Sequence, residues 1–144
     1  MRRSLLLLTT MALGVLMVSS VAQAASPRAQ CKQEAASLGV YLTGYKFVYG
    51  NNKTNVFTDT AGQPEVFCGL GGNDTIRTLA EGDIFISGAG TDSVYDNYGT
   101  FNGDAGDDSV YYNEVGGHFD GGDGYDTVGY DEGTLENVEG IVNP

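Results

Sequence analysis

One phrase recurs four times between residues 69 and 128, as Gly69-Leu-Gly-Gly-Asn-Asp74-Thr-Ile76, Ser87-Gly-Ala-Gly-Thr-Asp92-Ser-Val94, Gly103-Asp-Ala-Gly-Asp-Asp108-Ser-Val110 and Gly121-Gly-Asp-Gly-Tyr-Asp126-Thr-Val128. Each copy contains a glycine-rich stretch, an aspartate, a small hydroxylated residue and an aliphatic residue. Glycine adopts positive φ angles that a residue with a Cβ adopts only at a cost. Each copy therefore predicts a tight turn that ends in a carboxylate.

Apolar residues extend the same repeat along the chain. Most are nine residues apart, with one step of ten and two of seven: Phe57, Phe67, Ile76, Phe85, Val94, Phe101, Val110, Phe119, Val128 and Leu135. An amphipathic helix would repeat every three or four residues. A nine-residue period with glycine punctuation instead predicts stacked coils of strand, turn, strand and turn. The fold class is therefore all-β, a parallel β-roll or β-helix solenoid with a small N-terminal cap.

Two nine-residue units complete one coil, so the four full phrases are expected to stack on one edge of the solenoid. The turns of the opposite edge lack the full glycine and aspartate set; they lie around Glu81-Gly-Asp83, Tyr98-Gly, Gly116-Gly-His118 and Glu132-Gly. We therefore expect one metal-rich edge and one metal-poor edge.

The charge of the chain points to a cation as the ligand. The net charge is −12, and from residue 69 onward sixteen acidic residues face one basic residue, Arg77. This excludes nucleic acid as an ordinary partner, because binding there requires Lys and Arg to neutralise phosphates. Strands lie about 4.8 Å apart, and two unit charges about 5 Å apart repel by roughly 1–3 kcal/mol. Such acidity is also typical of disorder, and we expect disorder when no metal is bound.

Calcium suits these residues better than other metals. It accepts six to eight oxygen ligands in flexible geometry, backbone carbonyls included, whereas magnesium prefers a tight octahedron and keeps its waters. Zinc favours histidine and cysteine, and the chain has one histidine and two cysteines.

The four phrases resemble the nonapeptide repeat of the repeats-in-toxin (RTX) family, Gly-Gly-x-Gly-x-Asp-x-aliphatic-x, over residues 50–141. In that family, turns of neighbouring coils bind calcium between them. The resemblance implies side-chain ligands at Asp74, Asp92, Asp108 and Asp126. It implies backbone carbonyl ligands around Gly69, Gly71, Ser87, Ala89, Gly103, Ala105, Gly121 and Asp123.

Four stacked turns enclose three gaps, so about three calcium sites are expected. Asp92 and Asp108 would each border two gaps, and their replacement should be more damaging than that of Asp74. The last copy matches the family pattern fully, while the others each lack one glycine, at Leu70, Ser87 and Asp104. RTX proteins exported by a type I route carry an uncleaved C-terminal signal, whereas this chain begins with a different export signal.

Residues 1–24 are predicted to be a signal peptide. Arg2 and Arg3 precede an apolar run from Leu5 to Val18, and Ala22-Gln-Ala24 is a small-residue cleavage site. The alternative is a single membrane anchor, for which the apolar run is short. Cleavage would leave a secreted, extracellular chain without a membrane span and with a charge of 5 − 19 = −14.

The N-terminal part of the mature chain, residues 25–49, is predicted to be a leader and cap. Residues 25–30 are expected to be a loose leader, Lys32–Leu38 a short helix, and Val40–Tyr49 a β-prone segment covering the open end. The β-roll would then occupy residues 50–144. A secreted chain with two cysteines most simply forms one disulfide, here Cys31–Cys68; a catalytic or metal-binding cysteine is the alternative.

Three classes of function remain to be weighed. Enzymatic activity is not expected, because no nucleophile, base and orienting group can be assembled around the single histidine, His118. A calcium-stabilised structural or interaction protein requires only the features above, and it leads by parsimony.

A surface-binding module is the alternative. Thr75, Ser93, Ser109 and Thr127 form a rank of hydroxyls, and tyrosines occur nearby at Tyr95, Tyr98, Tyr111, Tyr112 and Tyr130. Such a face would bind a polysaccharide, a cell surface or ice, although serine and threonine are also simply good strand residues.

Overall fold

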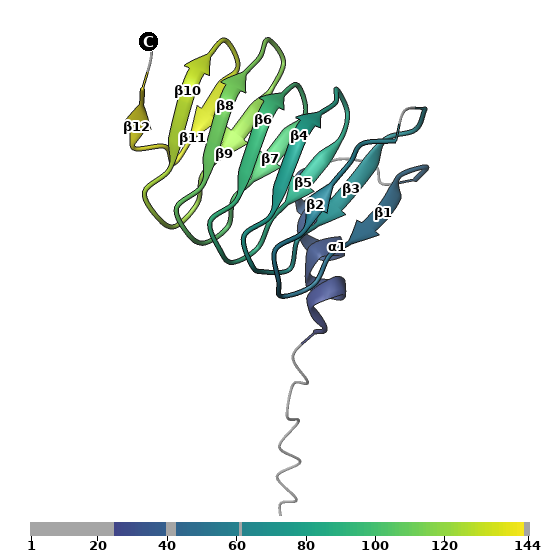
Figure 1. Ribbon diagram of the computed structural model, residues 1–144. Helices are drawn as coiled ribbons and strands as arrows, with labels where there is room; N and C mark the ends of the chain where they lie inside the picture. Colours follow the sequence, from purple (N-terminus) through teal and green to yellow (C-terminus); the bar gives the residue numbers. More distant parts are fainter. Residues whose placement is uncertain (1–24, 40–42, 61, 143–144) are drawn as a thin grey trace, which may run out of the picture.

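The computed structural model describes residues 25–39, 43–60 and 62–142 and shows a stack of coils built from two parallel sheets (Figure 1). The first sheet contains β1 (Lys46–Tyr49), β3 (Glu65–Cys68), β5 (Ile84–Ile86), β7 (Thr100–Asn102), β9 (His118–Asp120) and β11 (Thr134–Glu136). The second contains β2 (Val56–Phe57), β4 (Thr75–Leu79), β6 (Ser93–Asn97), β8 (Ser109–Asn113), β10 (Thr127–Asp131) and β12 (Gly140–Ile141). The predicted all-β parallel solenoid is confirmed.

The register of the strands follows the repeat seen in the sequence. Ile76 pairs with Val94, Val94 with Val110, and Val110 with Val128. On the other sheet Phe67, Phe85, Phe101 and Phe119 occupy one stack. Each coil therefore contributes one apolar residue from each sheet to the interior, as the nine-residue spacing predicts.

The core between the two sheets consists of these stacked apolar residues. The rings of Phe85 and Phe101 are 5.0 Å apart and those of Phe101 and Phe119 are 4.9 Å apart, nearly parallel in both pairs. All four phenylalanines of the stack are fully buried. Burying an aromatic side chain contributes on the order of 2–3 kcal/mol, so the phenylalanine stack is a main source of cohesion in a thin solenoid.

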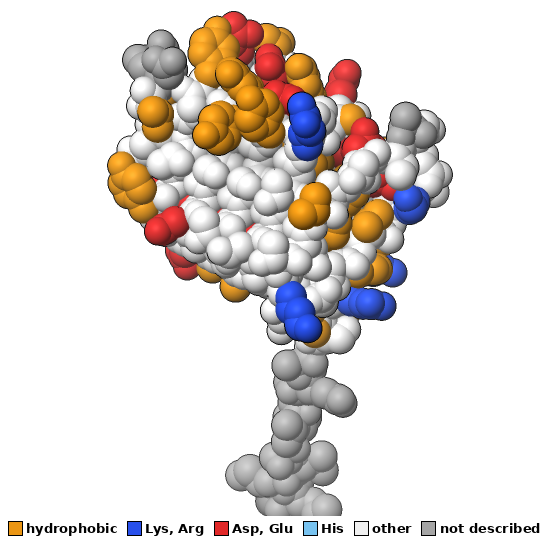
Figure 2. Space-filling view, in the orientation of Figure 1, with side chains coloured by type: hydrophobic (Ala, Val, Ile, Leu, Met, Phe, Trp, Pro, Cys, Tyr) orange, Lys and Arg blue, Asp and Glu red, His pale blue; other side chains and the backbone are white. Residues whose placement is uncertain are grey.

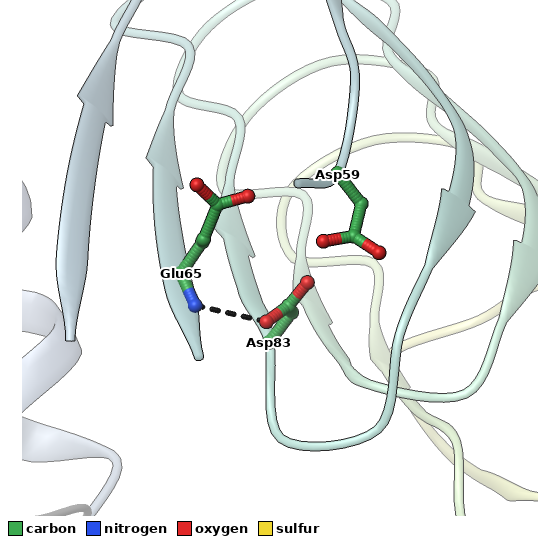
Figure 3. A group of neighbouring side chains, drawn as sticks. All are labelled: Asp59, Glu65 and Asp83. Atoms are coloured by element: carbon green, nitrogen blue, oxygen red, sulfur yellow. Dashed lines mark hydrogen bonds between the residues drawn. The ribbon is translucent and has the colours of Figure 1, made fainter. Parts of the chain in front are cut away.

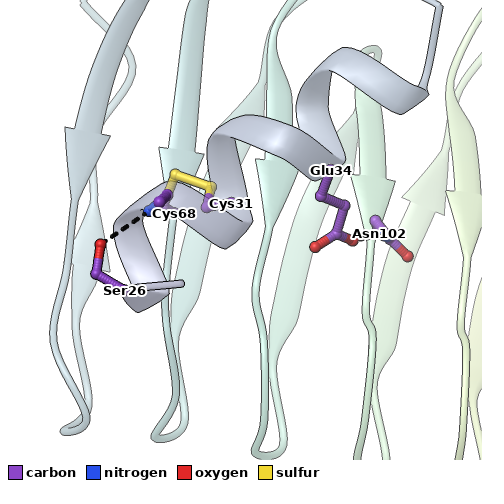
Figure 4. Close-up of a disulfide and its surroundings, with 6 residues drawn as sticks. Ser26, Cys31, Glu34, Cys68 and Asn102 are labelled. Atoms are coloured by element: carbon purple, nitrogen blue, oxygen red, sulfur yellow. Dashed lines mark hydrogen bonds between the residues drawn. A yellow bond between two sulfur atoms is a disulfide. The ribbon is translucent and has the colours of Figure 1, made fainter. Parts of the chain in front are cut away.

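One helix, α1 (Pro27–Ser37), packs on the outer face of the first sheet rather than over its open end. Cys31 and Ala35 are the buried residues of α1, and they pack against Val66 and Ile84. The predicted disulfide is confirmed, with Cys31 bonded to Cys68 and their Cα atoms 6.1 Å apart (Figure 4). The disulfide fixes the helix to the second strand of this sheet.

The helix begins earlier than its sequence suggested, so the expected loose leader at residues 25–30 is wrong. Ser26 is the N-cap and its hydroxyl accepts the N–H of Ala29, while Pro27 occupies the first helical turn. Proline is well suited to that place because its missing N–H would be unpaired there. The helix ends at Ser37, and Leu38 is its C-cap.

The strand β1 lies in the predicted cap. It pairs in parallel with β3 along its whole length and is the edge strand of the first sheet. Residues 40–42 of the predicted cap and the predicted signal peptide lie outside the described residues. Among the residues that the structure does describe, no helix is both long and apolar enough to cross a membrane.

Candidate metal centre

The four repeated aspartates lie on one edge of the solenoid, as predicted. Each is the last residue of a turn that leads from the first sheet to the second, directly before β4, β6, β8 or β10. Asp74, Asp92 and Asp126 are fully buried, and Asp108 is 1% exposed. Carboxylates are rarely buried to this degree without a compensating partner, so the polar contacts of these four determine what the edge can do.

The aspartates form a hydrogen-bonded ladder through one oxygen each. The backbone N–H of Asp74 donates to Oδ1 of Asp92 over 2.5 Å, and that of Asp92 donates to Oδ1 of Asp108 over 2.7 Å. The N–H of Asp108 donates in turn to Oδ1 of Asp126 over 2.7 Å. Each carboxylate therefore bridges to the coil before it and fixes the stacking of the turns.

Residues outside the four phrases continue this aspartate ladder at both ends. The N–H of Asn55 donates to Oδ1 of Asp74 over 2.7 Å, and the N–H of Asp126 donates to Oε2 of Glu139 over 2.8 Å. Glu139 takes the place that a fifth aspartate would have. Its spacing from Asp126 is thirteen residues, outside the period of the repeat, and for that reason the pattern did not reveal it.

The second oxygen of each ladder aspartate has no hydrogen-bond partner in the described part of the chain. This holds for Oδ2 of Asp74, Asp92, Asp108 and Asp126 alike. A buried polar atom without a partner costs about 1–3 kcal/mol, and more when it is charged. Four such atoms in equivalent positions mark places where this edge can accept a cation or a proton.

Burial changes the acidity of these groups in the same direction. It raises the pKa of Asp74 to about 6 and that of Asp108 to about 7, although the backbone N–H that each Oδ1 accepts opposes the shift. Neighbouring carboxylates add to the rise at Asp108. Burial likewise raises the pKa of Asp92 and Asp126. Without a cation, this edge therefore takes up protons more readily than ordinary carboxylates do.

The first residue of each turn lies directly beside an unpaired oxygen. A Cβ on Gly103 would be 2.3 Å from Oδ2 of Asp108 and 2.4 Å from the carbonyl oxygen of Gly121 in the next coil. Gly69 and Gly121 have the same surroundings, with carboxylate and carbonyl oxygens at 2.3–2.4 Å. At these three glycines a side chain would occupy the space between the oxygens.

Ser87 replaces glycine at the equivalent place in the second copy and makes its own contact. Its hydroxyl donates to the carbonyl oxygen of Gly103 over 2.8 Å. The other predicted carbonyl ligands hold the turns together: those of Ala89, Ala105 and Asp123 accept the N–H groups of Gly72, Gly90 and Gly106 over 2.8, 2.9 and 2.8 Å. The predicted ligand Gly71 belongs to the first of these turns and forms a bridge with Asn52.

The opposite edge carries a different ladder, made chiefly of asparagine. Nδ2 of Asn97 donates to Oδ1 of Asn113 and to the carbonyl oxygen of His118, over 2.8 and 3.0 Å. Nδ2 of Asn113 donates to Oδ1 of Asp131 over 2.8 Å. These residues end β6, β8 and β10. The sequence did not reveal their role, because amides are not among the carboxylates that the repeat pattern marks as metal ligands.

A separate group of acidic side chains lies near the start of this opposite edge. Ligand oxygens of Asp59, Glu65 and Asp83 are all within 4.8 Å of one another (Figure 3). The sequence placed Asp83 in a metal-poor turn and gave no role to the other two. They are 6 and 18 residues apart, so no local motif joins them, and only the stacking of β3 on β5 brings them together.

The hydroxyl rank and most of the tyrosines lie on the outer face of the second sheet. Thr75, Ser93, Ser109 and Thr127 are half-buried in register, and the hydroxyls of Thr75 and Ser93 are 3.2 Å apart.

Comparison of the chain with protein families, with curated proteins and with solved structures found no match.

Proposed function

We propose that this chain is a secreted, calcium-binding protein of the RTX type whose folding and stability depend on extracellular calcium, with a structural or surface-interaction role. The observation that carries the proposal is the row of four buried aspartates, each with one oxygen unpaired. The disulfide adds support, because disulfides persist mainly in oxidising compartments outside the cytosol.

A divalent cation fits the chemistry of these residues. The available ligands are the Oδ2 atoms of the four aspartates and the carbonyl oxygens beside them at Ser87, Gly121 and Asn137. All are hard oxygen donors of the kind that calcium binds. A bound calcium ion would neutralise the carboxylates and supply the partner that each buried oxygen lacks.

Calcium would act on folding by mass action. The turns exist only when the coils are stacked, so calcium binds the folded chain and not the unfolded one. With an extracellular-type dissociation constant of about 10⁻⁴ M, millimolar calcium contributes roughly 1.4 kcal/mol per site. The chain would remain unfolded during export and fold on meeting calcium outside the cell.

The test is far-UV circular dichroism of the disulfide-bonded protein without residues 1–24, titrated with calcium and then with excess chelator. We expect a reversible gain of β structure between micromolar and millimolar calcium that magnesium does not reproduce. Identical spectra throughout, together with no heat of calcium binding, would contradict the proposal.

A pair of variants assigns the effect to the aspartate ladder. Asp92→Ala removes a cation ligand and leaves the buried N–H of Asp74 unpaired, so we expect a loss of about 2 kcal/mol in calcium buffer. Asp123→Ala is the matched control, because its side chain is exposed on the same edge and its removal changes the charge equally. Equal midpoints of unfolding for the two variants would show that the aspartate ladder does not contribute to stability.

The alternative function is a calcium-dependent surface-binding module, and the arrangement of the tyrosines favours it. Tyr95 and Tyr111 stack with ring centroids 5.0 Å apart, and Tyr112 lies against Tyr95 and Tyr130 at 5.5 and 6.5 Å. Figure 2 shows apolar side chains gathered near the ends of β6, β8 and β10. All four rings are at least 39% exposed, and exposed aromatic rings with neighbouring hydroxyls suit a polysaccharide.

This alternative is tested by co-sedimentation with insoluble cellulose or chitin in calcium buffer. Tyr111→Ala should reduce the bound fraction several-fold, because its ring is central to the tyrosine cluster. Tyr125→Ala is a matched control: Tyr125 is also 59% exposed but lies in a turn outside the second sheet. No binding, or equal loss in both variants, leaves the structural role alone.

A further inference from the structure

A second cluster of carboxylates lies on the edge opposite the aspartate ladder, at the first coil. Asp59 follows β2, Glu65 begins β3, and Asp83 directly precedes β5. Their ligand oxygens lie within 4.8 Å of one another, and in Figure 3 the three side chains converge on one space. None of them belongs to a glycine–aspartate phrase, so this cluster is independent of the ladder on the other edge.

Asp83 gives a second observation that points to a ligand. It is only 3% exposed, and its Oδ1 accepts the backbone N–H of Glu65 over 2.8 Å. Its Oδ2 is buried without a hydrogen-bond partner among the described residues, and Figure 3 shows this oxygen directed toward Asp59. Burial raises the pKa of Asp83 to about 6, against the effect of the Glu65 N–H, and the charges of Asp59 and Glu65 raise it further.

Glu65 is held as a charged carboxylate on the other side of the cluster. It is fully buried and forms an ion pair with Lys46, while its Oε2 accepts the N–H of Thr60 over 2.8 Å. Burial acts to raise the pKa of Glu65, but the hydrogen bonds from Lys46 and Thr60 outweigh it and lower the pKa. Three carboxylates and one ammonium leave a local charge of −3 + 1 = −2, which one divalent cation neutralises.

We propose that Asp59, Glu65 and Asp83 form a further calcium site, which ties the turn after β2 to the starts of β3 and β5. The site takes a hard divalent cation because every side-chain donor is a carboxylate oxygen. A pocket of about 560 Å³ lined by Tyr45, Asp59, Pro64 and Asp83 leaves it open to solvent, so an ion can enter after folding.

Its structural role differs from that of the ladder. The ladder joins turns that are alike, whereas this site joins the segment that carries Asp59 to the regular coils. The nearby disulfide attaches α1 to β3, and the ion attaches β3 to β2 and β5. The disulfide and the ion both stabilise the N-terminal coil, where the glycine-rich turns are missing.

Terbium luminescence tests the site in the disulfide-bonded protein without residues 1–24. Tb³⁺ replaces calcium at oxygen sites, and a tyrosine beside it transfers excitation energy to the ion. Tyr45 lines this pocket, so Tyr45→Phe should abolish a distinct component of the luminescence and leave calcium binding unchanged. A luminescence titration unaltered by Tyr45→Phe and by Asp83→Asn overturns the proposal.

Calcium counting by equilibrium dialysis at pH 7.5 gives the second readout. Asp83→Asn keeps the acceptor for the Glu65 N–H and removes one charge, so we expect one ion fewer than in the unaltered protein. Asp123→Asn is the control for lost charge. If Asp83→Asn does not fold, Asp59→Asn replaces it, since Asp59 is half-buried and lies outside the strands. An unchanged count means that Asp59 and Asp83 share a proton instead, and the site is refuted.

The outcome is distinguishable from the proposed function. Asp108→Asn removes a ligand of the ladder and leaves the Tyr45-dependent luminescence intact if the two sites are independent. If Asp83→Asn loses that luminescence and Asp108→Asn keeps it, this site is supported even if the ladder binds no calcium. Conversely, a calcium-dependent ladder with no Tyr45-dependent signal supports the proposed function and refutes the further site.

Discussion

The two edges of the solenoid stack polar side chains in ladders that pair to different degrees. Every aspartate of one ladder leaves an oxygen unpaired, whereas the amides of the other pair with one another and leave only Oδ1 of Asn97 unpaired among them. On one edge each aspartate accepts a backbone N–H through Oδ1 and leaves Oδ2 unpaired. On the other, Asn113 accepts through Oδ1 from Asn97 and donates through Nδ2 to Asp131 and to the carbonyl oxygen of Thr134. The difference is one atom, an oxygen in place of an NH₂ group.

That atom decides what each edge needs from its surroundings. An amide has both donors and acceptors, so a column of amides can be completed by the protein itself. A column of carboxylates has only acceptors, and it remains incomplete until a cation or a proton is added. We therefore expect calcium and pH to act on the aspartate column and to leave the column of Asn97 and Asn113 unchanged, apart from the separate carboxylate cluster at the first coil.

The largest expected effect of this difference is an inverted pH dependence without calcium. The pKa of Asp108 is raised to about 7, so its protonated form is favoured by folding. Its stability contribution is complete below the unfolded-state pKa of about 4 and is lost as pH rises to about 7. Asp74, whose pKa burial raises to about 6, acts in the same direction.

The folded fraction in chelator at pH 5 and pH 8, measured by far-UV circular dichroism, tests this effect. We expect the protein to be more stable at pH 5, and calcium to reverse the order because protons and calcium compete for the same oxygens. Stability in chelator that rises from pH 5 to pH 8 would show that the aspartates are solvated and that the two edges do not differ.

The regular part of the fold was predictable because the same residue types recur at a fixed spacing, with apolar residues in the core and aspartates in the turns. Phe85 and Phe101 are stacked in neighbouring coils, as their spacing requires, and Asp74 and Asp92 lie in equivalent turns of adjacent coils. Such inferences succeed when each coil repeats the last, since a single register then fixes every contact.

The remainder depends on contacts that no period encodes. The strand β1 and the helix α1 are placed by pairing with β3 and by the disulfide, both of which join distant residues. Glu65 and Asp83 face one another only because β3 stacks on β5. The first coil lacks the repeat, so its cation site and its strand boundaries could not be read from local sequence.

A single substitution on the asparagine edge should create there a buried carboxylate oxygen without a hydrogen-bond donor. Asn113→Asp removes the two donors of Nδ2 and places a carboxylate against Asp131. We expect a loss of roughly 3 kcal/mol, because only Nδ2 of Asn97 still donates to the buried charge and its second oxygen faces the acceptors of Asp131 and Thr134. Thermal unfolding at pH 8 measures it, with the exposed Asn51→Asp as the control for added charge. Equal melting temperatures would mean that the asparagine column is not needed.

The converse substitution has the smallest expected effect and separates the two edges most cleanly. Asp108→Asn keeps Oδ1 as the acceptor for the N–H of Asp92 and puts an NH₂ group where Oδ2 was unpaired. The carbonyl oxygen of Gly121 lies on the same side of Gly103 as that atom and is the acceptor that the new group requires.

Asp108→Asn should therefore be more stable than the unaltered protein in chelator at pH 8, by about 1 kcal/mol for one added hydrogen bond. In calcium the order should reverse, because the variant has one cation ligand fewer. The folded fraction of each protein in the two buffers, measured by far-UV circular dichroism, gives four free energies of folding, and their difference of differences isolates the contribution of calcium at this coil. If the variant is less stable in both buffers, Asp108 contributes by its shape and not by its charge. The difference between the edges would then result from packing and not from charge, because an amide is stabilising at position 113 but would be destabilising at position 108.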